Sequence, residues 1–166
     1  MARTNHESVD SAMEVYGSNL DLDLREFVRD IQDFPKEGIL FKDITPLLTN
    51  ATAFQATLDQ LTKAVQGRKI DKVVGVESRG FIFAAALAAR LKAGLVLVRK
   101  PGKLPYETHR EEYALEYGKD ALEVHKDAIK KGENIWIVDD LLATGGTSQA
   151  AINLIKKLQG RVDMVS

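Results

Sequence analysis

The sequence predicts an α/β fold in which a central, mostly parallel sheet is flanked by helices. Three short apolar runs have the length and composition of buried parallel strands: Lys72–Val76, Gly94–Val98 and Ile135–Val138. The first and the third each continue through a loop into a helical pattern. This alternation of strand, loop and helix is typical of βαβ units, whose parallel sheet is covered on both faces.

Two helices follow these strands. Phe81–Leu91, after the first strand, is rich in Ala and Leu. The helix after the third strand has an apolar face at i, i+3, i+4 and i+7, formed by Ala151, Leu154, Ile155 and Leu158. Gly160 predicts the end of this helix, and Val162–Val165 begins a further apolar run.

The other segments have weaker patterns. Asp23–Ile31 and Ala53–Val65 are predicted helices, whereas Phe34–Pro46, with two prolines and a glycine, is predicted as a structured loop. Pro101–Gly118 is long for a connection inside a compact domain, and we expect a flexible lid over an active site there. The polar residues 1–20 are predicted to form a mobile arm, with residues 21–166 as one domain.

Composition limits the class of protein. The 166 residues have a net charge of −1, which argues against nucleic-acid binding through bulk basicity, and no apolar run approaches the roughly 20 residues that span a bilayer. Since cysteine and a secretory signal are both absent, we expect a soluble, cytoplasmic protein with neither nucleic acid nor membrane as partner. His6, His109 and His125 lack the spacing of metal ligands.

The most informative stretch runs from Ile135 to Thr147 and reads IWIVDDLLATGGT. A buried strand delivers Asp139 and Asp140 to its carboxyl end, where open α/β sheets bind ligands. The glycines after it allow several backbone N–H groups to converge on one anion, with a helix N-terminus behind them. The loop is therefore predicted to bind a phosphate monoester, with the hydroxyl groups of Thr144 and Thr147 as further donors.

The two carboxylates specify the ligand further, because they would repel a phosphate unless another part of the same molecule needed acceptors. A ribose diol supplies two donors close to its own 5′-phosphate, so the pattern indicates a ribose 5-phosphate. Neither GxxxxGK[ST] nor GxGxxG is present. The alternative is a glycine-rich turn after an acidic strand end that binds no ligand.

This stretch resembles the signature with which type I phosphoribosyltransferases bind phosphoribosyl pyrophosphate (PRPP), and the chain resembles the adenine-specific branch of that family. Four more blocks share the resemblance, in matching order from about Leu24 to Ser166: Phe34–Ile44, Glu77–Phe81, Arg99–Pro105 and Leu115–Gly118. The resemblance implies the type I phosphoribosyltransferase fold. It also implies the transfer of a phosphoribosyl group from PRPP to N9 of adenine, which gives AMP and diphosphate in purine salvage.

The resemblance implies which residues bind PRPP. The pyrophosphate is expected on four basic residues, Arg79, Arg99, Lys100 and Lys103, because guanidinium groups suit its oxygens. The diol is expected on Asp139 and Asp140. The 5′-phosphate is expected on the loop residues Ala143, Thr144, Gly145, Gly146 and Thr147. Mg²⁺ is the implied cofactor, held mainly by PRPP itself.

The base is implied to pair with the backbone around Leu40 and to pack on Phe41. A carbonyl facing N6–H and an N–H facing N1 suit adenine, whereas a 6-oxopurine would place like groups opposite each other. Lys42, also expected at the base, stands where many family members have arginine. On the lid, Glu116 is implied to act on the purine's proton, with Tyr117 as a binding residue and Tyr113 as a weaker candidate.

Three further properties are implied: a homodimer, a cis peptide bond between Glu77 and Ser78, and a fold that in other members continues about one strand beyond the position of Ser166. Two alternatives are a PRPP-sensing regulator without catalysis and a phosphoribosyltransferase for another base. The lid with Glu116 favours an enzyme over the regulator.

Overall fold

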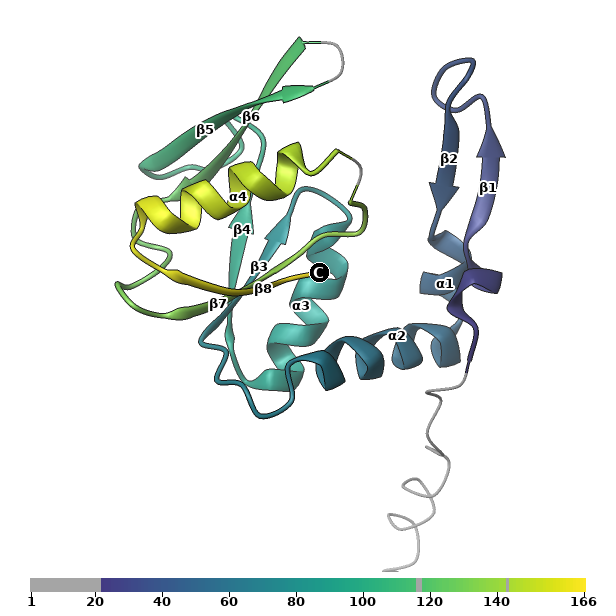
Figure 1. Cartoon of the computed structure of the whole chain (residues 1–166), viewed down its shortest axis with the longest axis horizontal. Coiled ribbons are helices and arrows are strands. Elements are labelled where there is room, and N and C mark those ends of the chain that lie inside the picture. The colour runs from purple at the N-terminus through teal and green to yellow at the C-terminus, as the bar shows by residue number, and fades with distance from the viewer. Residues whose placement is uncertain (1–21, 116–117, 143) are drawn as a thin grey trace, which may run out of the picture. The chain divides into compact units, whose positions relative to one another are not determined.

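The structure is a computed structural model that describes residues 22–115, 118–142 and 144–166. The chain divides into two compact units, of which the first ends at Gln60 and the second comprises Leu61–Ser166. The division falls within helix α2 (Ala51–Ala64), labelled in Figure 1, which confirms the helix predicted over Ala53–Val65. None of the helices in these residues is both long and apolar enough to cross a membrane.

The first unit contains a two-stranded antiparallel sheet. Its elements before α2 are the 3₁₀ helix η3 (Leu24–Phe27), the strands β1 (Arg29–Gln32) and β2 (Leu40–Asp43), and the helix α1 (Thr45–Thr49). The register of β1 and β2 places Asp30 opposite Lys42 and Arg29 opposite Asp43, so opposite charges face each other across the pair.

Two predictions for the first unit are wrong. The helix expected over Asp23–Ile31 is only the short η3, because the backbone is extended at Val28 and then enters β1. The loop expected over Phe34–Pro46 contains β2 and the start of α1. Strands of four residues are too short to produce a recognisable apolar period, and these two are stabilised by their pairing with each other.

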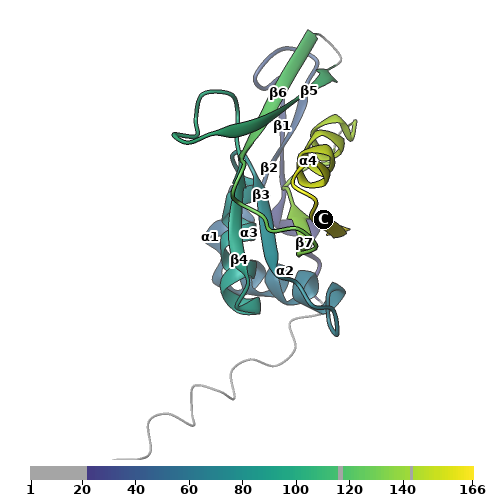
Figure 2. The ribbon, with the colours of Figure 1, turned by 90° about the vertical axis from the view of Figure 1, so that its left-hand side faces the viewer.

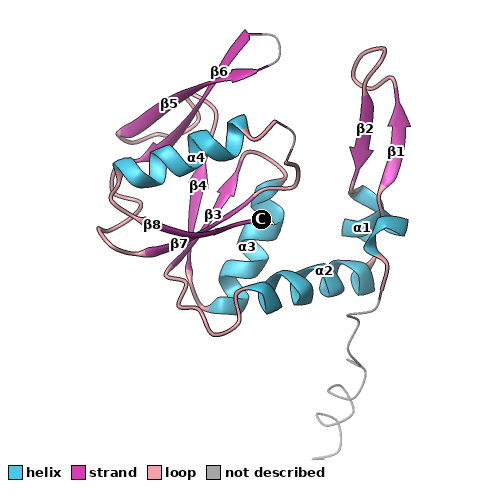
Figure 3. Ribbon diagram, viewed as in Figure 1, coloured by secondary structure: helices cyan, strands magenta, loops and turns pink. Residues whose placement is uncertain are grey.

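The second unit is built on a four-stranded parallel sheet, drawn in magenta in Figure 3, which confirms the predicted fold class. Its strands are β3 (Lys72–Val76), β4 (Gly94–Val98), β7 (Asn134–Val138) and β8 (Arg161–Val165). Their order in the sheet is β4-β3-β7-β8. The three predicted strands are confirmed almost to the residue, and the apolar run after Gly160 forms the edge strand β8.

The two faces of this sheet are covered by different helices, α3 (Gly80–Leu91) and α4 (Gly146–Lys157). On one face, Gly75 of β3 approaches α3 so closely that an added Cβ would lie 2.8 Å from the Cβ of Ala84. On the other face, Val74 and Ile137 belong to a buried cluster with Leu154 of α4. Figure 2 shows α4 on one side of β3 and β4. Side chains that alternate along each strand thus serve two separate cores.

The connection between β4 and β7 contains a hairpin, so the loop predicted over Pro101–Gly118 is wrong for its second half, where Thr108–Leu115 form a strand. β5 (Thr108–Leu115) pairs with β6 (Gly118–His125) in antiparallel register, as Figure 1 shows. β6 also joins the end of β4, because the backbones of Arg99 and Glu123 exchange hydrogen bonds of 2.9 and 2.7 Å. The charged sequence of β5 has no apolar period, and its strand conformation depends on the partner strand.

Candidate active site

The predicted PRPP-binding side chains gather where β3, β4 and β7 end. Because these strands are parallel, their carboxyl ends share one edge of the sheet, where the following loops line an open pocket. Its walls include Arg79 after β3, Lys100 after β4 and Tyr113 of β5. The loop after β7 contributes Asp139, Asp140, Thr144, Gly145 and Thr147.

The loop between β7 and α4 has the geometry of an anion-binding turn. Gly145 adopts the left-handed conformation with a φ of 81°, and Gly146 begins α4. An added Cβ on Gly146 would lie 3.1 Å from the carbonyl oxygen of Ala114 and 3.3 Å from the Tyr113 ring, so β5 packs directly against the loop. The first N–H groups of α4 have no partners within the helix, and this helix end lies at the pocket.

Asp139 and Asp140 stand at the end of β7 in different environments. Burial raises the pKa of Asp139 to about 6; the charge of Asp140 adds to this effect, while Arg79 and the Asp140 amide oppose it. That amide donates to Oδ1 of Asp139 at 2.9 Å. The carboxylate of Asp140 forms an ion pair with Arg79, with 2.7 Å between Oδ2 and Nη2. The two adjacent carboxylates therefore differ: Asp139 is shifted toward its protonated form, and Asp140 is paired with a cation.

Glu77, which the sequence analysis did not select as a site residue, organises the basic residues. Its carboxylate accepts from the Lys100 amide at 2.8 Å and from Nε of Arg99 at 3.2 Å. Burial alone would raise the pKa of Glu77, but these donors outweigh it and hold the pKa below its ordinary value. Arg99 also donates to the carbonyl oxygen of the exposed Lys103 at 3.1 Å. The position of Glu77 at the end of a buried strand was the signal that could have identified it.

The peptide bond between Glu77 and Ser78 is cis, which confirms the expectation from the resemblance.

Lys100 joins the sheet to the hairpin. Its ammonium forms an ion pair with Asp120 of β6 and donates to the hydroxyl of Tyr113 of β5 at 2.9 Å. Burial would lower the pKa of Lys100, but the two hydrogen bonds outweigh it and raise that pKa above its ordinary value. No sequence pattern identified Asp120, because only the register of β5 and β6 brings it beside Tyr113 and Lys100.

The predicted base-binding residues Leu40, Phe41 and Lys42 lie together on β2, in the first unit. Leu40 is exposed, and the rings of Phe41 and Phe34 meet edge to face with 5.1 Å between their centroids. Lys42 forms an exposed ion pair with Asp30, with 2.6 Å between Nζ and Oδ1. The strand therefore presents an apolar side chain and an aromatic pair beside a cation that already has a partner.

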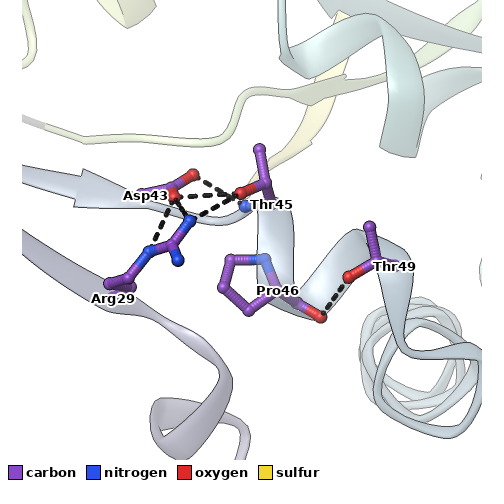
Figure 4. Close-up of polar contacts among 5 residues, drawn as sticks. All are labelled: Arg29, Asp43, Thr45, Pro46 and Thr49. Carbon is purple, nitrogen blue, oxygen red and sulfur yellow. Dashed lines mark hydrogen bonds and ion pairs between the residues drawn. The ribbon is translucent and has the colours of Figure 1, made fainter.

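A polar network holds the end of β2, as Figure 4 shows. Asp43 accepts from Nη2 of Arg29 at 2.6 Å and from the Thr45 amide at 2.9 Å. The Arg29 guanidinium, followed by Thr45, lowers the pKa of Asp43 to about 2. Within α1, the hydroxyl of Thr49 donates to the Pro46 carbonyl oxygen at 3.2 Å. The turn from β2 into α1 is thus fixed by side chains as well as by backbone.

Four sequence-based predictions fall outside the described residues: the lid residues Glu116 and Tyr117, the loop residue Ala143, and the arm over residues 1–20. These stay predictions. In the described segments, no three His, Cys, Asp or Glu side chains converge as they would around a metal ion.

Comparison with known proteins agrees with this architecture. Residues 46–162 match the model of the phosphoribosyl transferase domain family. A parallel sheet whose β7 ends in two carboxylates and a glycine loop is thus the core of a phosphoribosyltransferase, and the chain belongs to that family.

Its relatives specify the branch. The adenine phosphoribosyltransferase of Trichlorobacter lovleyi is 59% identical over 140 residues, which cover 84% of this chain and 82% of the relative. The crystal structure of adenine phosphoribosyltransferase from Thermoanaerobacter pseudethanolicus matches with a TM-score of 0.83 at 55% identity, over 86% of this chain and 83% of that one. The Saccharomyces cerevisiae enzyme, complexed with D-2,5-dideoxy-2,5-imino-altritol 1,6-bisphosphate and adenine, matches with a TM-score of 0.80 at 41% identity, over 90% and 89% of the two chains. Within the family, the chain falls among the adenine phosphoribosyltransferases.

Proposed function

We propose that the protein transfers the 5-phosphoribosyl group from PRPP to N9 of adenine, giving AMP and diphosphate. One observation carries this proposal: Asp139 and Asp140 directly precede a glycine loop at the N-terminus of α4. A ribose 5-phosphate matches both parts, since its diol donates to carboxylates and its phosphate accepts from loop amides. The similarity to adenine phosphoribosyltransferases over more than four fifths of each chain supports adenine as the base.

The diphosphate end of PRPP is assigned to the basic residues Arg79, Arg99, Lys100 and Lys103. Arg79 and Lys100 line the pocket, and Glu77 orients Arg99 and the backbone at Lys100. As the bond from C1′ to the diphosphate oxygen breaks, negative charge grows on the leaving group. Cations already held in place stabilise that charge more in the transition state than in the ground state, which accelerates the step.

Base recognition and proton transfer are assigned from the resemblance. The backbone of Leu40 would pair with adenine and the ring of Phe41 would pack on it, while N9 attacks C1′ from the side opposite the diphosphate. Glu116 would accept the proton that N9 loses, and Tyr117 would bind substrate beside it. The ion pair of Lys42 with Asp30 argues for a supporting role of Lys42 at the base rather than a direct one.

Mg²⁺ is proposed as the cofactor, bound mainly by the oxygens of PRPP. Asp139 and Asp140 are the two carboxylates that line the pocket after β7. This small number of protein ligands suits a hard cation that takes most of its ligands from substrate and water. When bound, Mg²⁺ would neutralise charge on the diphosphate.

A homodimer is also proposed. Three large apolar side chains on α3 and β4 are exposed: Ile82, Leu95 and Leu97. A two-fold interface with a second copy would remove them from water. Light scattering at micromolar concentration should give twice the mass of the chain, and the mass of a monomer would contradict this assignment.

Initial rates of AMP formation from adenine, PRPP and Mg²⁺ test the function directly. In competition among adenine, hypoxanthine, guanine and orotate, adenine should have the highest kcat/KM. Preference for another base would contradict the assignment of adenine. Binding of PRPP without nucleotide formation from any of the four bases would indicate a PRPP sensor in place of an enzyme.

A further inference from the structure

Each of three basic residues assigned to the diphosphate is already paired with a carboxylate of the chain. The pairs are Arg79 with Asp140, Arg99 with Glu77, and Lys100 with Asp120. Asp139 adds another carboxylate to the pocket wall. A free polyanion that binds Arg79, Arg99 or Lys100 must therefore compete with the carboxylate partner of that residue.

The pair of Arg79 and Asp140 differs from the other two, because both of its members line the pocket. The Asp140 side chain is only 10% exposed and the Arg79 side chain 33% exposed. While the pair is intact, the Asp140 carboxylate is therefore largely shielded from water, and it needs another donor when the guanidinium moves to a ligand. A ribose diol supplies two O–H donors, and Asp140 is one of the two carboxylates assigned to that diol.

We propose that Asp140 is a specificity-determining residue whose ion pair with Arg79 opposes the binding of free diphosphate and is released by a ribose diol. This inference rests on the proposed function, since it takes PRPP as the natural ligand. PRPP contains the diol and the diphosphate in one molecule, so it supplies donors for Asp140 and acceptors for Arg79 together. Inorganic diphosphate supplies only the acceptors and leaves the Asp140 carboxylate without a donor.

A carboxylate that merely binds the diol would behave differently. Its removal would weaken the binding of PRPP and leave the binding of inorganic diphosphate unchanged. A partly unfolded site would weaken the binding of both ligands. The exchange of partners at Arg79 predicts that the affinities for the two ligands change in opposite directions. Without the charge at position 140, inorganic diphosphate binds more tightly and PRPP binds less tightly.

The test is a calorimetric titration of inorganic diphosphate and of PRPP, each with Mg²⁺ and without adenine. Asp140→Asn keeps the shape of the side chain and removes its charge. It should bind diphosphate about three- to tenfold more tightly than the wild type, because the Asp140 carboxylate no longer competes for Arg79, and PRPP about ten- to a hundredfold less tightly. Asp127→Asn is the matched control, since Asp127 is an exposed carboxylate on the loop after β6, and it should bind both ligands like the wild type.

A second pair of variants tests whether the gain in diphosphate affinity depends on Arg79. Arg99, Lys100 and Lys103 remain for diphosphate in Arg79→Gln. In that background, adding Asp140→Asn should change diphosphate affinity by less than about twofold, because no ion pair is left to break. An undiminished gain would mean simple charge repulsion and overturn the proposal, as would an Asp140→Asn protein that binds diphosphate no more tightly than the wild type. The titrations need no turnover, so a wild-type protein that forms no AMP would contradict the proposed function alone.

Discussion

At the scale of single residues, the pocket depends on two close backbone approaches at glycines. The N-terminus of α3 lies against the end of β7, where an added Cβ on Gly80 would be 2.9 Å from the Val138 carbonyl oxygen and 3.1 Å from Oδ1 of Asp139. The N-terminus of α4 meets β5 in a similar way at Gly146. Both glycines hold a strand end and a helix end together at the ligand site.

Gly80→Ala should therefore cost stability and displace Asp139. The new methyl group meets backbone, which cannot rotate away, so we expect a loss of about 1–3 kcal/mol in the free energy of unfolding and a higher KM for PRPP. Urea unfolding measures the first and initial rates the second. Gly94→Ala is the control: its Cβ would meet only the Lys72 side chain, 2.7 Å from Cδ, and that chain can move. Equal losses in both variants would contradict the steric explanation.

Glu116 is the residue for which a purely catalytic effect is expected. General acid–base assistance is worth about 10²–10⁴ in rate, so Glu116→Ala should lower kcat by that factor and leave the titrated affinity for PRPP near the wild-type value. Glu112→Ala removes a carboxylate four residues earlier in the chain, where it forms an exposed ion pair with Arg110, and should leave kcat unchanged. A Glu116→Ala protein with full kcat would reduce the lid to a shield against water.

At the scale of elements, the hairpin of β5 and β6 is the part that connects the two proposed anion sites. Lys100, assigned to the diphosphate, is bonded to both of its strands, and β5 packs against the loop assigned to the 5′-phosphate. On its other side, Glu111 of β5 accepts from Nδ2 of Asn153 at 2.8 Å and pairs with Nζ of Lys157 at 2.5 Å, both on α4. The hairpin is thus attached to α4 by side chains.

Glu111→Ala should loosen this attachment. Exposed ion pairs contribute little, so the expected loss is about 0.2–1 kcal/mol in global stability. A larger effect is expected locally, as faster amide hydrogen exchange in β5 with unchanged exchange in β3 and β7. Lys156→Ala, an exposed neighbour of Lys157 on α4, is the control and should leave exchange in β5 as it is. Uniform exchange changes across the sheet would mean that Glu111 supports the whole unit.

At the scale of the whole molecule, the site reduces stability at neutral pH. The carboxyl of Asp139 has an ordinary pKa of 3.8 and a pKa of about 6 in the folded protein, because burial disfavours its charged form. The folded state thus binds the proton more tightly than the unfolded chain. The resulting stabilisation is fully present below about pH 4 and is lost as the pH rises through 6.

Asp139→Asn isolates this contribution, because the other carboxylates are common to both proteins. The free energy of unfolding of Asp139→Asn minus that of the wild type should increase between pH 4 and pH 8 by at most about 3 kcal/mol, from roughly two pKa units at 1.36 kcal/mol each. Urea unfolding at several pH values measures the difference. A difference for Asp139→Asn that does not change with pH would rule out the raised pKa.

The sequence alone determined three strands of the parallel sheet, the helices α3 and α4, the position of the glycine loop after β7, and the family. Each of these is recorded locally: a buried strand is a short apolar run, a covering helix has a repeating apolar face, and the loop needs two carboxylates, glycines and hydroxyl groups within thirteen consecutive residues. The strand β3 and the helix α3 that follows it were therefore predictable without knowledge of what packs against them.

The tertiary structure alone decided which distant residues meet. β1 with β2 and β5 with β6 are strands because they pair, and neither member of a pair has a periodic pattern of its own. The same holds for the partners of the basic residues: Asp120 reaches Lys100 through the register of the hairpin, and Asp140 reaches Arg79 because two parallel strands end side by side. Registers depend on the free energy of the assembled sheet, which no local segment contains.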